Sequence, residues 1–132
     1  MNFFKIILAL FLVILFVSCD PGSTIKYEII NTTNEAIKVK YQFVFNASGD
    51  TSSKETIISP KSSKILNQES TLGYVTHYDE RHDSIFLYWL KIETQNEMTH
   101  KNFKDKKYWR LEKTDSQNGI YKLIVDKTLF ND

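Results

Sequence analysis

Apolar and polar residues alternate along several stretches of this chain. Ile25, Tyr27 and Ile29 are separated by Lys26 and Glu28, and residues 37–45 and 121–125 alternate in the same way. A period of two is typical of a strand with one buried and one exposed face. The apolar positions are mostly β-branched or aromatic, as strands prefer. Because no helical stripe persists over three turns, the pattern predicts an all-β domain.

Turn-forming residues separate these stretches and set the expected strand ends. The segments 31–35, 46–54, 59–62 and 115–119 are rich in Asn, Asp, Ser and Gly. In the last of them, Asn-Gly is typical of a tight hairpin whose turn residues have positive φ. The pattern predicts seven or eight strands, over residues 24–30, 36–45, 54–58, 63–68, 72–77, 84–94, 106–114 and 120–126.

The stretch 84–94 is apolar on both faces, which predicts a central strand with Trp89 as an anchor of the core. Antiparallel strands of this number and length favour a single immunoglobulin-like β-sandwich over residues 25–132. An eight-stranded lipocalin-like barrel is the alternative, although it is tight at this length. Four tyrosines in alternating strands are expected to point inward: Tyr27, Tyr41, Tyr88 and Tyr121.

The N-terminus has the pattern of an export signal. Lys5 precedes an unbroken apolar run from Ile6 to Val17, and polar residues follow from Ser18. As a helix this run would reach roughly 18 Å, whereas a bilayer core is about 30 Å thick. The run is therefore too short for a permanent span and fits the apolar region of a signal peptide, here residues 1–18.

The residues Phe16-Val17-Ser18-Cys19 resemble the lipobox of bacterial lipoproteins, although Leu is usual where Phe16 stands. The resemblance implies cleavage before Cys19 and a covalent diacylglycerol and N-acyl chain on that residue. Cys19 is the single cysteine of the sequence, so the exported domain has no disulfide. Residues 19–24 are then a short tether between the lipid and the domain.

The junction FVSCD and the strong preference for Lys over Arg resemble small lipoproteins of the Bacteroidetes. That resemblance implies a lipid-anchored protein of the outer membrane, whereas Asp20 would favour the inner membrane in enteric bacteria. The segment YEIINTTNEAIKVKY resembles the first hairpin of small β-sandwich lipoproteins of unknown function. This likeness implies no activity.

Charge limits the classes of partner. Without Lys5, 16 basic residues stand against 16 acidic ones, and a nucleic-acid-binding protein would show a basic excess. The segment 101–113 is locally basic and holds Tyr108 and Trp109, which makes it a weak candidate for binding anionic headgroups or an acidic partner. An exposed edge strand protected by lysines is the favoured interpretation.

Residues 77–83 contain two His, two Asp and one Glu, which are ligand types for a divalent metal. His77 and His82 are therefore weak metal candidates. No motif supplies a third ligand, and a solvated turn in which Arg81 balances the acids is the favoured interpretation. No cofactor other than the lipid on Cys19 is expected.

The sequence contains no nucleophile motif and only four glycines. We therefore expect a non-enzymatic interaction module of the cell envelope whose partner is another envelope protein. One alternative is a lipid- or glycan-binding protein with an apolar pocket formed by Phe86, Trp89 and Trp109. Another is a metal-dependent hydrolase built on His77 and His82.

Overall fold

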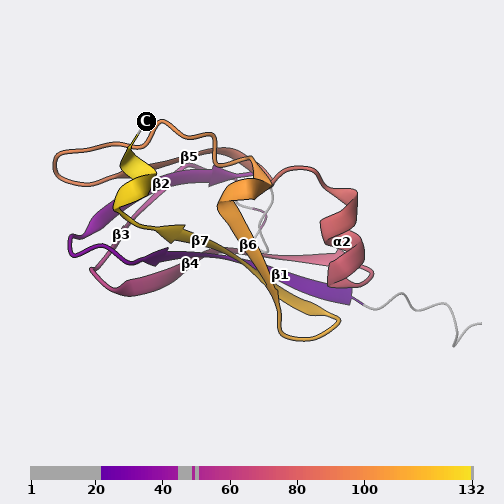
Figure 1. Cartoon of the computed structure of the whole chain (residues 1–132). Coiled ribbons are helices and arrows are strands. Elements are labelled where there is room, and N and C mark those ends of the chain that lie inside the picture. The colour runs from indigo at the N-terminus through magenta and orange to yellow at the C-terminus, as the bar shows by residue number, and fades with distance from the viewer. Residues whose placement is uncertain (1–21, 45–48, 50, 132) are drawn as a thin grey trace, which may run out of the picture.

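The computed structural model describes residues 22–44, 49 and 51–131, and it forms two stacked β-sheets (Figure 1). One sheet has the strand order β4-β1-β7-β6 and the other has the order β3-β2-β5. The two sheets do not close into a barrel, so the prediction of a β-sandwich is confirmed and the barrel alternative is wrong. The strands are β1 (Gly22–Asn31), β2 (Ile37–Phe43), β3 (Lys54–Ile58), β4 (Ser62–Leu72), β5 (Leu87–Glu93), β6 (Trp109–Lys113) and β7 (Asn118–Val125).

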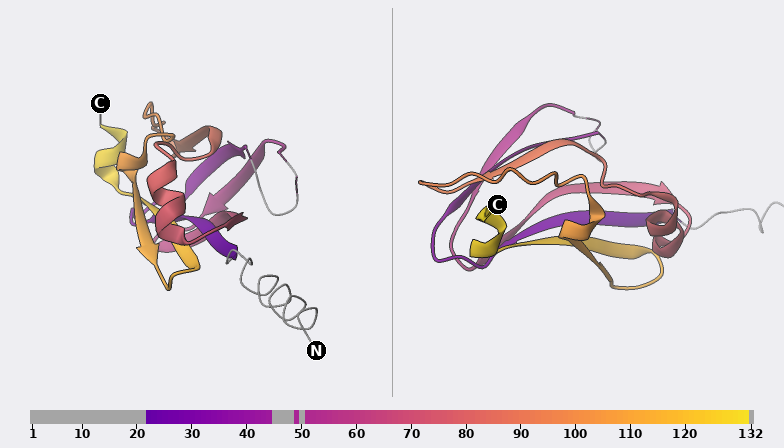
Figure 2. Two further views of the ribbon diagram at one scale, coloured as in Figure 1. Left: turned by 90° about the vertical axis from the view of Figure 1, so that its right-hand side faces the viewer. Right: turned by 45° about the horizontal axis from the view of Figure 1, so that its top comes forward.

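The core lies between the sheets and follows the alternation of the sequence, and Figure 2 shows the two layers from two further directions. In β1, every second residue from Ser23 to Asn31 is buried. Three of the four tyrosines expected to point inward, Tyr27, Tyr41 and Tyr121, are buried. The fourth expectation is wrong, because the Tyr88 side chain is 53% exposed.

One strand pair departs from the antiparallel arrangement that we expected. β1 pairs with β4 antiparallel but with β7 parallel, with Tyr27 opposite Tyr121. A parallel pair needs a long crossover between its strands, and here nearly the whole domain lies between β1 and β7. Periodicity within a strand carries no information about this pairing, because it reports only which face is buried.

The predicted strand 72–77 is wrong, because β4 ends at Leu72 and helix α2 (Val75–Arg81) follows. Gly73 connects them with a φ of 89°, a conformation that glycine adopts without strain. The helix buries Val75 and Tyr78, which are three residues apart and therefore share a face. Seven residues are too few to produce a recognisable helical stripe.

Strand β5 is shorter than the predicted strand 84–94, and a register shift opposite Gln42 and Phe43 changes which side chains point inward. Trp89 is consequently only half-buried, and its Nε1 donates to Gln42 Oε1 at 3.1 Å. The expectation that Trp89 anchors the core is therefore wrong. Trp109 takes that role, with 7% exposure and its ring edge-on to Tyr27.

The predicted strand 106–114 divides into a short 3-10 helix, η1 (Lys106–Tyr108), and the edge strand β6. A second 3-10 helix, η2 (Lys127–Phe130), follows β7. In the part of the chain that the structure describes, no helix is both long and apolar enough to cross a bilayer.

The sandwich has two dissimilar ends, which β1 connects (Figure 1). Ten residues of strand span roughly 30 Å. The proximal end contains Gly22, Leu72, α2 and the β6–β7 turn. The distal end contains the β1–β2 turn, the turn at residues 94–97 and η2. Because β1 already begins at Gly22, residues 22–24 of the expected tether belong to the sheet, while the expected signal and Cys19 lie outside the described residues.

Candidate functional site

The distal end is organised by one buried side chain, that of Asn31 at the end of β1. Its Nδ2 donates to the carbonyl oxygens of Glu35, Ile58 and Ser59 at 2.8, 3.2 and 3.1 Å. Its Oδ1 accepts from the backbone N and the hydroxyl of Thr33 at 3.0 and 2.8 Å. A fully bonded buried amide fixes the chain around it. The β1–β2 turn is therefore held in one conformation.

Two further segments of the distal end are stabilised by hydrogen bonds between their own side chains and their own backbone. Thr94 Oγ1 accepts from the backbone N of Asn96 and of Glu97 at 3.3 and 3.1 Å. Asp126 caps η2 by accepting from the backbone N of Thr128 at 2.9 Å. Because local side-chain bonds satisfy these turns, we expect the other polar side chains on their rims to contribute little to stability.

A cleft of about 400 Å³ opens between these three segments, and we call it the distal cleft. Amide and carboxylate side chains dominate its lining, and Phe130 contributes one half-buried aromatic ring. A neighbouring hollow of about 500 Å³ shares Glu35 and Thr94 with it. The lining residues of the distal cleft are Thr33, Asn34, Glu35, Thr94, Asn96, Glu97, Lys127, Phe130 and Asn131.

Sequence reasoning did not find this cleft, because its three segments are separated by about 30 residues or more. Local signals were nevertheless present. Asn-x-Thr at 31–33, Thr-x-x-Glu at 94–97 and Asp-x-Thr at 126–128 are spacings at which a side chain can bond to a nearby backbone N–H. Each spacing predicts a self-supported turn, but none predicts that the three turns meet.

The proximal end has a different construction, with a polar network buried beneath α2. Tyr27 Oη donates to Glu69 Oε1 at 2.5 Å, and Tyr78 Oη of α2 donates to the same oxygen. The two hydroxyl oxygens also lie 2.9 Å apart. Glu69 is only 7% exposed, although it is a carboxylic residue. Burial, reinforced by Glu69, raises the pKa values of Tyr27 and Tyr78 far above that of a free phenol.

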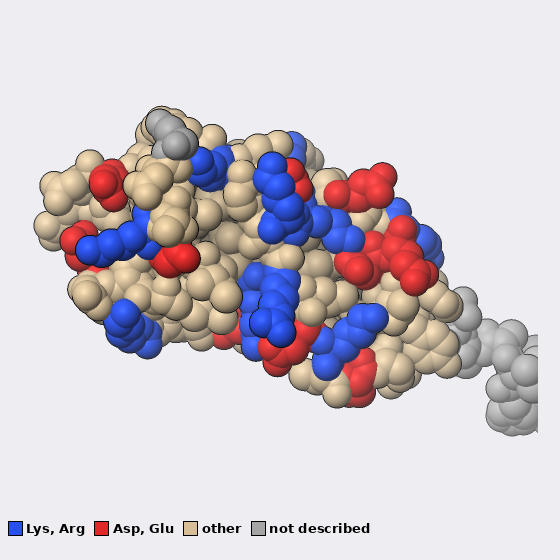
Figure 3. Space-filling model, viewed as in Figure 1, with Lys and Arg blue, Asp and Glu red and all other residues tan. Residues whose placement is uncertain are grey.

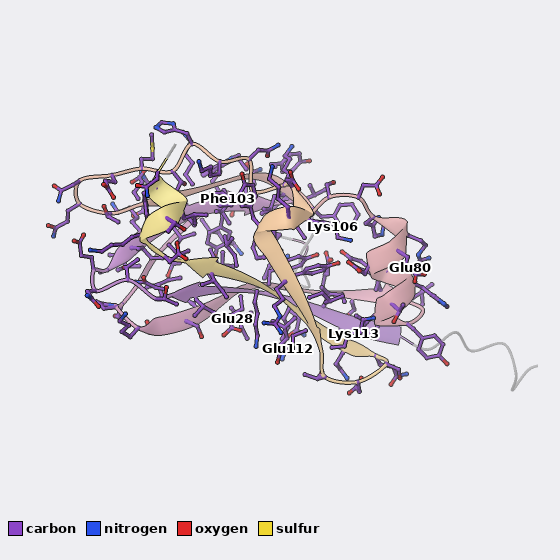
Figure 4. The ribbon with its side chains drawn as sticks, viewed as in Figure 1. Glu28, Glu80, Phe103, Lys106, Glu112 and Lys113 are labelled. Carbon is purple, nitrogen blue, oxygen red and sulfur yellow. The ribbon has the colours of Figure 1, made fainter. Side chains whose placement is uncertain are left out.

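A second set of contacts fastens the outer side of α2. Tyr121 Oη donates to Asp79 Oδ1 at 2.5 Å, and Lys106 Nζ lies 2.5 Å from the same oxygen. Figure 4 shows Lys106 between β6 and the helix. Partial burial opposes ionisation of Asp79, but its hydrogen bonds with Lys106 and Tyr121 lower its pKa. We call Tyr27, Glu69, Tyr78, Asp79, Lys106 and Tyr121 the helix clamp.

Of the predicted metal candidates, His77 lies on α2 and His82 directly follows it as the C-cap residue, so the favoured interpretation of 77–83 as a solvated turn is wrong. His77 is exposed and packs beside Tyr74, whereas the half-buried His82 ring lies 4.8 Å from Tyr78 and 4.6 Å from Phe86. Among the described residues no group of three or more His, Cys, Asp or Glu side chains is arranged to hold a metal ion.

The basic segment 101–113 does not form one continuous surface. Lys106 belongs to the helix clamp, Lys107 pairs with Asp105 at 3.0 Å, and Lys101 donates to the Asn131 carbonyl at 2.7 Å. On the face seen in Figure 3, blue and red side chains are interspersed. β6 is an edge strand, as expected, and the protective role of the lysines in this segment stays a prediction.

The aromatic residues proposed for binding are also separated by the fold. Trp109 is buried, and its Nε1 donates to the Phe103 carbonyl at 2.8 Å. Tyr108 is half-buried against Phe103, with the ring centroids 5.4 Å apart. Phe86 packs against Tyr78 and His82 at the proximal end. Trp109 belongs to the core, and Phe86 and Tyr108 pack against it.

No protein family, curated protein or solved structure matches this chain.

Proposed function

We propose that this protein is a bacterial lipoprotein, held at a membrane through acylated Cys19, whose β-sandwich is a non-enzymatic interaction module of the cell envelope. The observation that carries the proposal is the separation of the two ends. The chain from Cys19 joins the sandwich at Gly22, at one end of β1, and the distal cleft lies beyond the other end. An anchor at Cys19 would therefore hold the distal cleft away from the lipid, where a partner could reach it.

The chemistry of the distal cleft supports binding and not catalysis. Glu35 and Glu97 line it together with amides, and among the described lining residues Lys127 is the only basic one. The strongly perturbed phenols lie instead in the helix clamp, where they donate hydrogen bonds to Glu69 and Asp79. A phenol with a raised pKa that is already hydrogen-bonded is unsuited to act as a base at neutral pH.

The alternative function is that of a small-ligand-binding lipoprotein, and the lining of the cleft favours a glycan over a lipid as the ligand. Lipid-binding pockets are mainly apolar, whereas amide and carboxylate groups predominate in this cleft and Phe130 alone provides an aromatic surface. A hydroxyl-rich ligand such as an envelope glycan would match these groups better than an acyl chain would.

The test is chemical cross-linking of the full-length protein in its native membrane, followed by recovery of the adducts. We expect acylation at Cys19, recovery with the membrane fraction, and a dominant cross-linked envelope protein. Glu97→Lys, which inverts a charge in the distal cleft, should greatly reduce the adduct. Glu80→Lys, the same change on α2 at the proximal end, is the matched control and should leave the adduct unchanged.

Cys19→Ala provides the second control, because it removes the acylated thiol. Release of this variant from the membrane is expected. A protein that is not acylated, or an adduct that responds to Glu80→Lys and not to Glu97→Lys, would contradict the proposal. Shifts of the Asn34 and Asn96 side-chain amide signals in NMR spectra on addition of glycans, without a protein adduct, would favour the alternative.

A further inference from the structure

We propose that the proximal end is a membrane-contacting face, on which Leu72 and Tyr74 enter the interfacial region of the bilayer. This inference rests on the proposed function, because it requires the acylated Cys19. Leu72 is 68% exposed and Tyr74 is 44% exposed. Isolated exposed apolar residues need no explanation, but these two are neighbours at the point where the chain enters the sheet.

Covalent geometry places this pair close to the anchor. Only residues 20 and 21 separate Cys19 from Gly22, so the two Cα atoms are at most roughly 11 Å apart. Gly22 is the direct partner of Leu72 in the β1–β4 ladder. An acylated Cys19 lies at the membrane surface, and the domain has too little chain to move Leu72 far from it. The membrane is therefore the occupant that the tether brings to this face.

The local structure keeps the two side chains at the surface. Gly22 has no side chain that could cover Leu72, and it lies across the ladder from it. Arg81 Nη2 donates to the Leu72 carbonyl at 3.2 Å, and Arg81 Nε donates to the His77 carbonyl at 3.0 Å. These bonds tie the end of β4 to α2. The helix clamp in turn holds α2 on the sheet, so the pair is presented on a rigid support.

The residue types match the chemistry of a membrane interface. Tyrosine is enriched at the level of the headgroups and leucine in the acyl region beneath them. Leu72 also lines a hollow of about 410 Å³ with His77, Glu80 and Arg81. The mixed charges of Glu80 and Arg81 give no excess that would attract anionic lipid. We therefore expect an apolar contact that depends little on ionic strength or on the content of anionic lipid.

The experiment uses the acylated full-chain product, in which Cys19 is blocked and an introduced cysteine is the only free thiol. Leu72→Cys carries an environment-sensitive fluorophore, and Ile57→Cys is the matched control. Ile57 is 64% exposed, nearly as much as Leu72, but lies on β3 near the distal end. Each labelled protein is reconstituted in phosphatidylethanolamine vesicles, with and without phosphatidylglycerol.

We expect doxyl-labelled lipid to quench the fluorophore at residue 72 at least threefold more than that at residue 57, and aqueous iodide to do the reverse. Added salt and phosphatidylglycerol should change neither result. In the Cys19→Ala background both fluorophores should become equally accessible to iodide. A further variant keeps Leu72 and carries the fluorophore at Tyr74→Cys. Its quenching should match that at residue 72, which would show that the result reflects the location of the label and not the loss of the leucine side chain.

The outcomes distinguish this inference from the proposed function. If the protein is not acylated at Cys19, both fail. If it is acylated and recovered with the membrane, but residues 72 and 74 are as accessible to iodide as residue 57, the inference is wrong and the proposed function stands. Protection that disappears in salt would replace the apolar contact by an electrostatic one and would also overturn the inference.

Discussion

The two ends of the sandwich use polar residues in opposite ways. At the proximal end, the helix clamp buries phenols and the Glu69 carboxylate, adds the partly buried Asp79 and Lys106, and bonds these groups to one another across β1, β4, β7, α2 and η1. At the distal end, Asn31 and two short side-chain-capped turns satisfy the backbone, and the remaining polar residues line an open cleft.

This comparison teaches which residues of each end are needed for stability. A buried polar group that loses its partner destabilises the fold strongly, so changes in the clamp are expected to lower the free energy of unfolding. The exposed polar side chains at the rim of the distal cleft lie on turns that other residues hold, and changes to these polar side chains are expected to alter binding alone. The mutations below test this division, beginning with the largest expected effect on stability.

Tyr27→Ala is expected to have the largest effect. Tyr27 is fully buried, stacks on Tyr121 at 5.6 Å between ring centroids, and donates to Glu69. Loss of a buried aromatic ring lowers the free energy of unfolding by about 4 kcal/mol. Urea denaturation followed by circular dichroism measures the change. Tyr27→Phe, which removes only the hydroxyl, should lower it by about 1 kcal/mol.

Phe130→Ala is the matched control at the distal end, because Phe130 is aromatic but only partly buried. It should destabilise the protein by about 1 kcal/mol or less, in proportion to the smaller area it buries. If Tyr27→Ala and Phe130→Ala lowered the free energy of unfolding equally, the two ends would not differ in their contribution to stability.

Gly119→Ala tests how closely α2 packs on the sheet. A Cβ at this position would lie 2.8 Å from Val75 Cγ1 and 3.2 Å from Leu111 Cδ1. Such overpacking lowers the free energy of unfolding by about 2 kcal/mol. In a Val75→Ala background the added methyl group has room, so the same change should have a clearly smaller effect. If the losses in the free energy of unfolding were additive in this double-mutant cycle, contact with Val75 of α2 would not be the reason that position 119 requires glycine.

Gly119 also shows what the sequence could predict. The hairpin at 115–119 was predicted correctly, and Asp115 Oδ1 accepts from the backbone N of Gln117 and Asn118 at 2.7 Å. The expectation of positive φ at Asn118-Gly119 was wrong, because Gly73 and Gly49 are the described glycines with positive φ. Gly119 is required because Val75, 44 positions earlier in the chain, lies against it. Local sequence patterns do not contain that contact.

The same limit applies to the two candidate regions. The core of β1, β2 and β7 was predictable because alternation is a local property that burial of one sheet face imposes. The helix clamp could not be predicted. In the sequence Glu69 is indistinguishable from an exposed acidic residue, because its partner Tyr27 is 42 residues away along the chain. The distal cleft was equally hidden, because it exists only where three separate turns meet.

Ionisation of the tyrosines of the helix clamp at alkaline pH tests whether their hydroxyl groups are buried and hydrogen-bonded. Burial, followed by the nearby carboxylates, raises the pKa values of Tyr27, Tyr78 and Tyr121 above the usual value near 10. In the unfolded chain these phenols ionise near pH 10, but in the folded protein they stay protonated. Their contribution to stability is therefore complete below pH 10 and is lost as the pH rises further.

Tyrosinate absorbance near 295 nm checks this expectation. The clamp tyrosines should ionise only in a phase that coincides with unfolding, because their pKa values are raised. Tyr121→Phe should reduce the amplitude of that phase. A single phase near pH 10 without loss of structure would contradict the buried network.

Asp79→Asn tests the outer side of the clamp at acid pH. The Lys106 and Tyr121 contacts lower the pKa of Asp79 against the opposing effect of partial burial. A carboxyl with a lowered folded pKa contributes stability above its unfolded pKa and loses it as the pH falls through the folded value. The variant should therefore be less stable than the wild type at pH 7 and should differ less below pH 3. Asp83→Asn, at an exposed position two residues beyond the end of α2, is the control, and urea midpoints at both pH values provide the measurement.

The smallest effect on stability is expected for Glu97→Ala and Asn34→Ala in the distal cleft. Both side chains are exposed, and the turn at 94–97 is held by Thr94 Oγ1 and by the backbone N of Thr94, which donates to the Glu97 carbonyl at 2.8 Å. Such substitutions usually change the free energy of unfolding by less than about 0.5 kcal/mol. Cross-linking to the envelope partner should nevertheless fall sharply.

Asn31→Ala makes this comparison decisive, because it removes the buried amide beneath the same cleft. It should lower the free energy of unfolding by about 2 kcal/mol, since the groups that Asn31 satisfies lose their partner. It should also weaken cross-linking, because the β1–β2 turn is no longer held. Loss of stability in Glu97→Ala as large as in Asn31→Ala would mean that the rim residues support the fold, and the distal end would then resemble the proximal one.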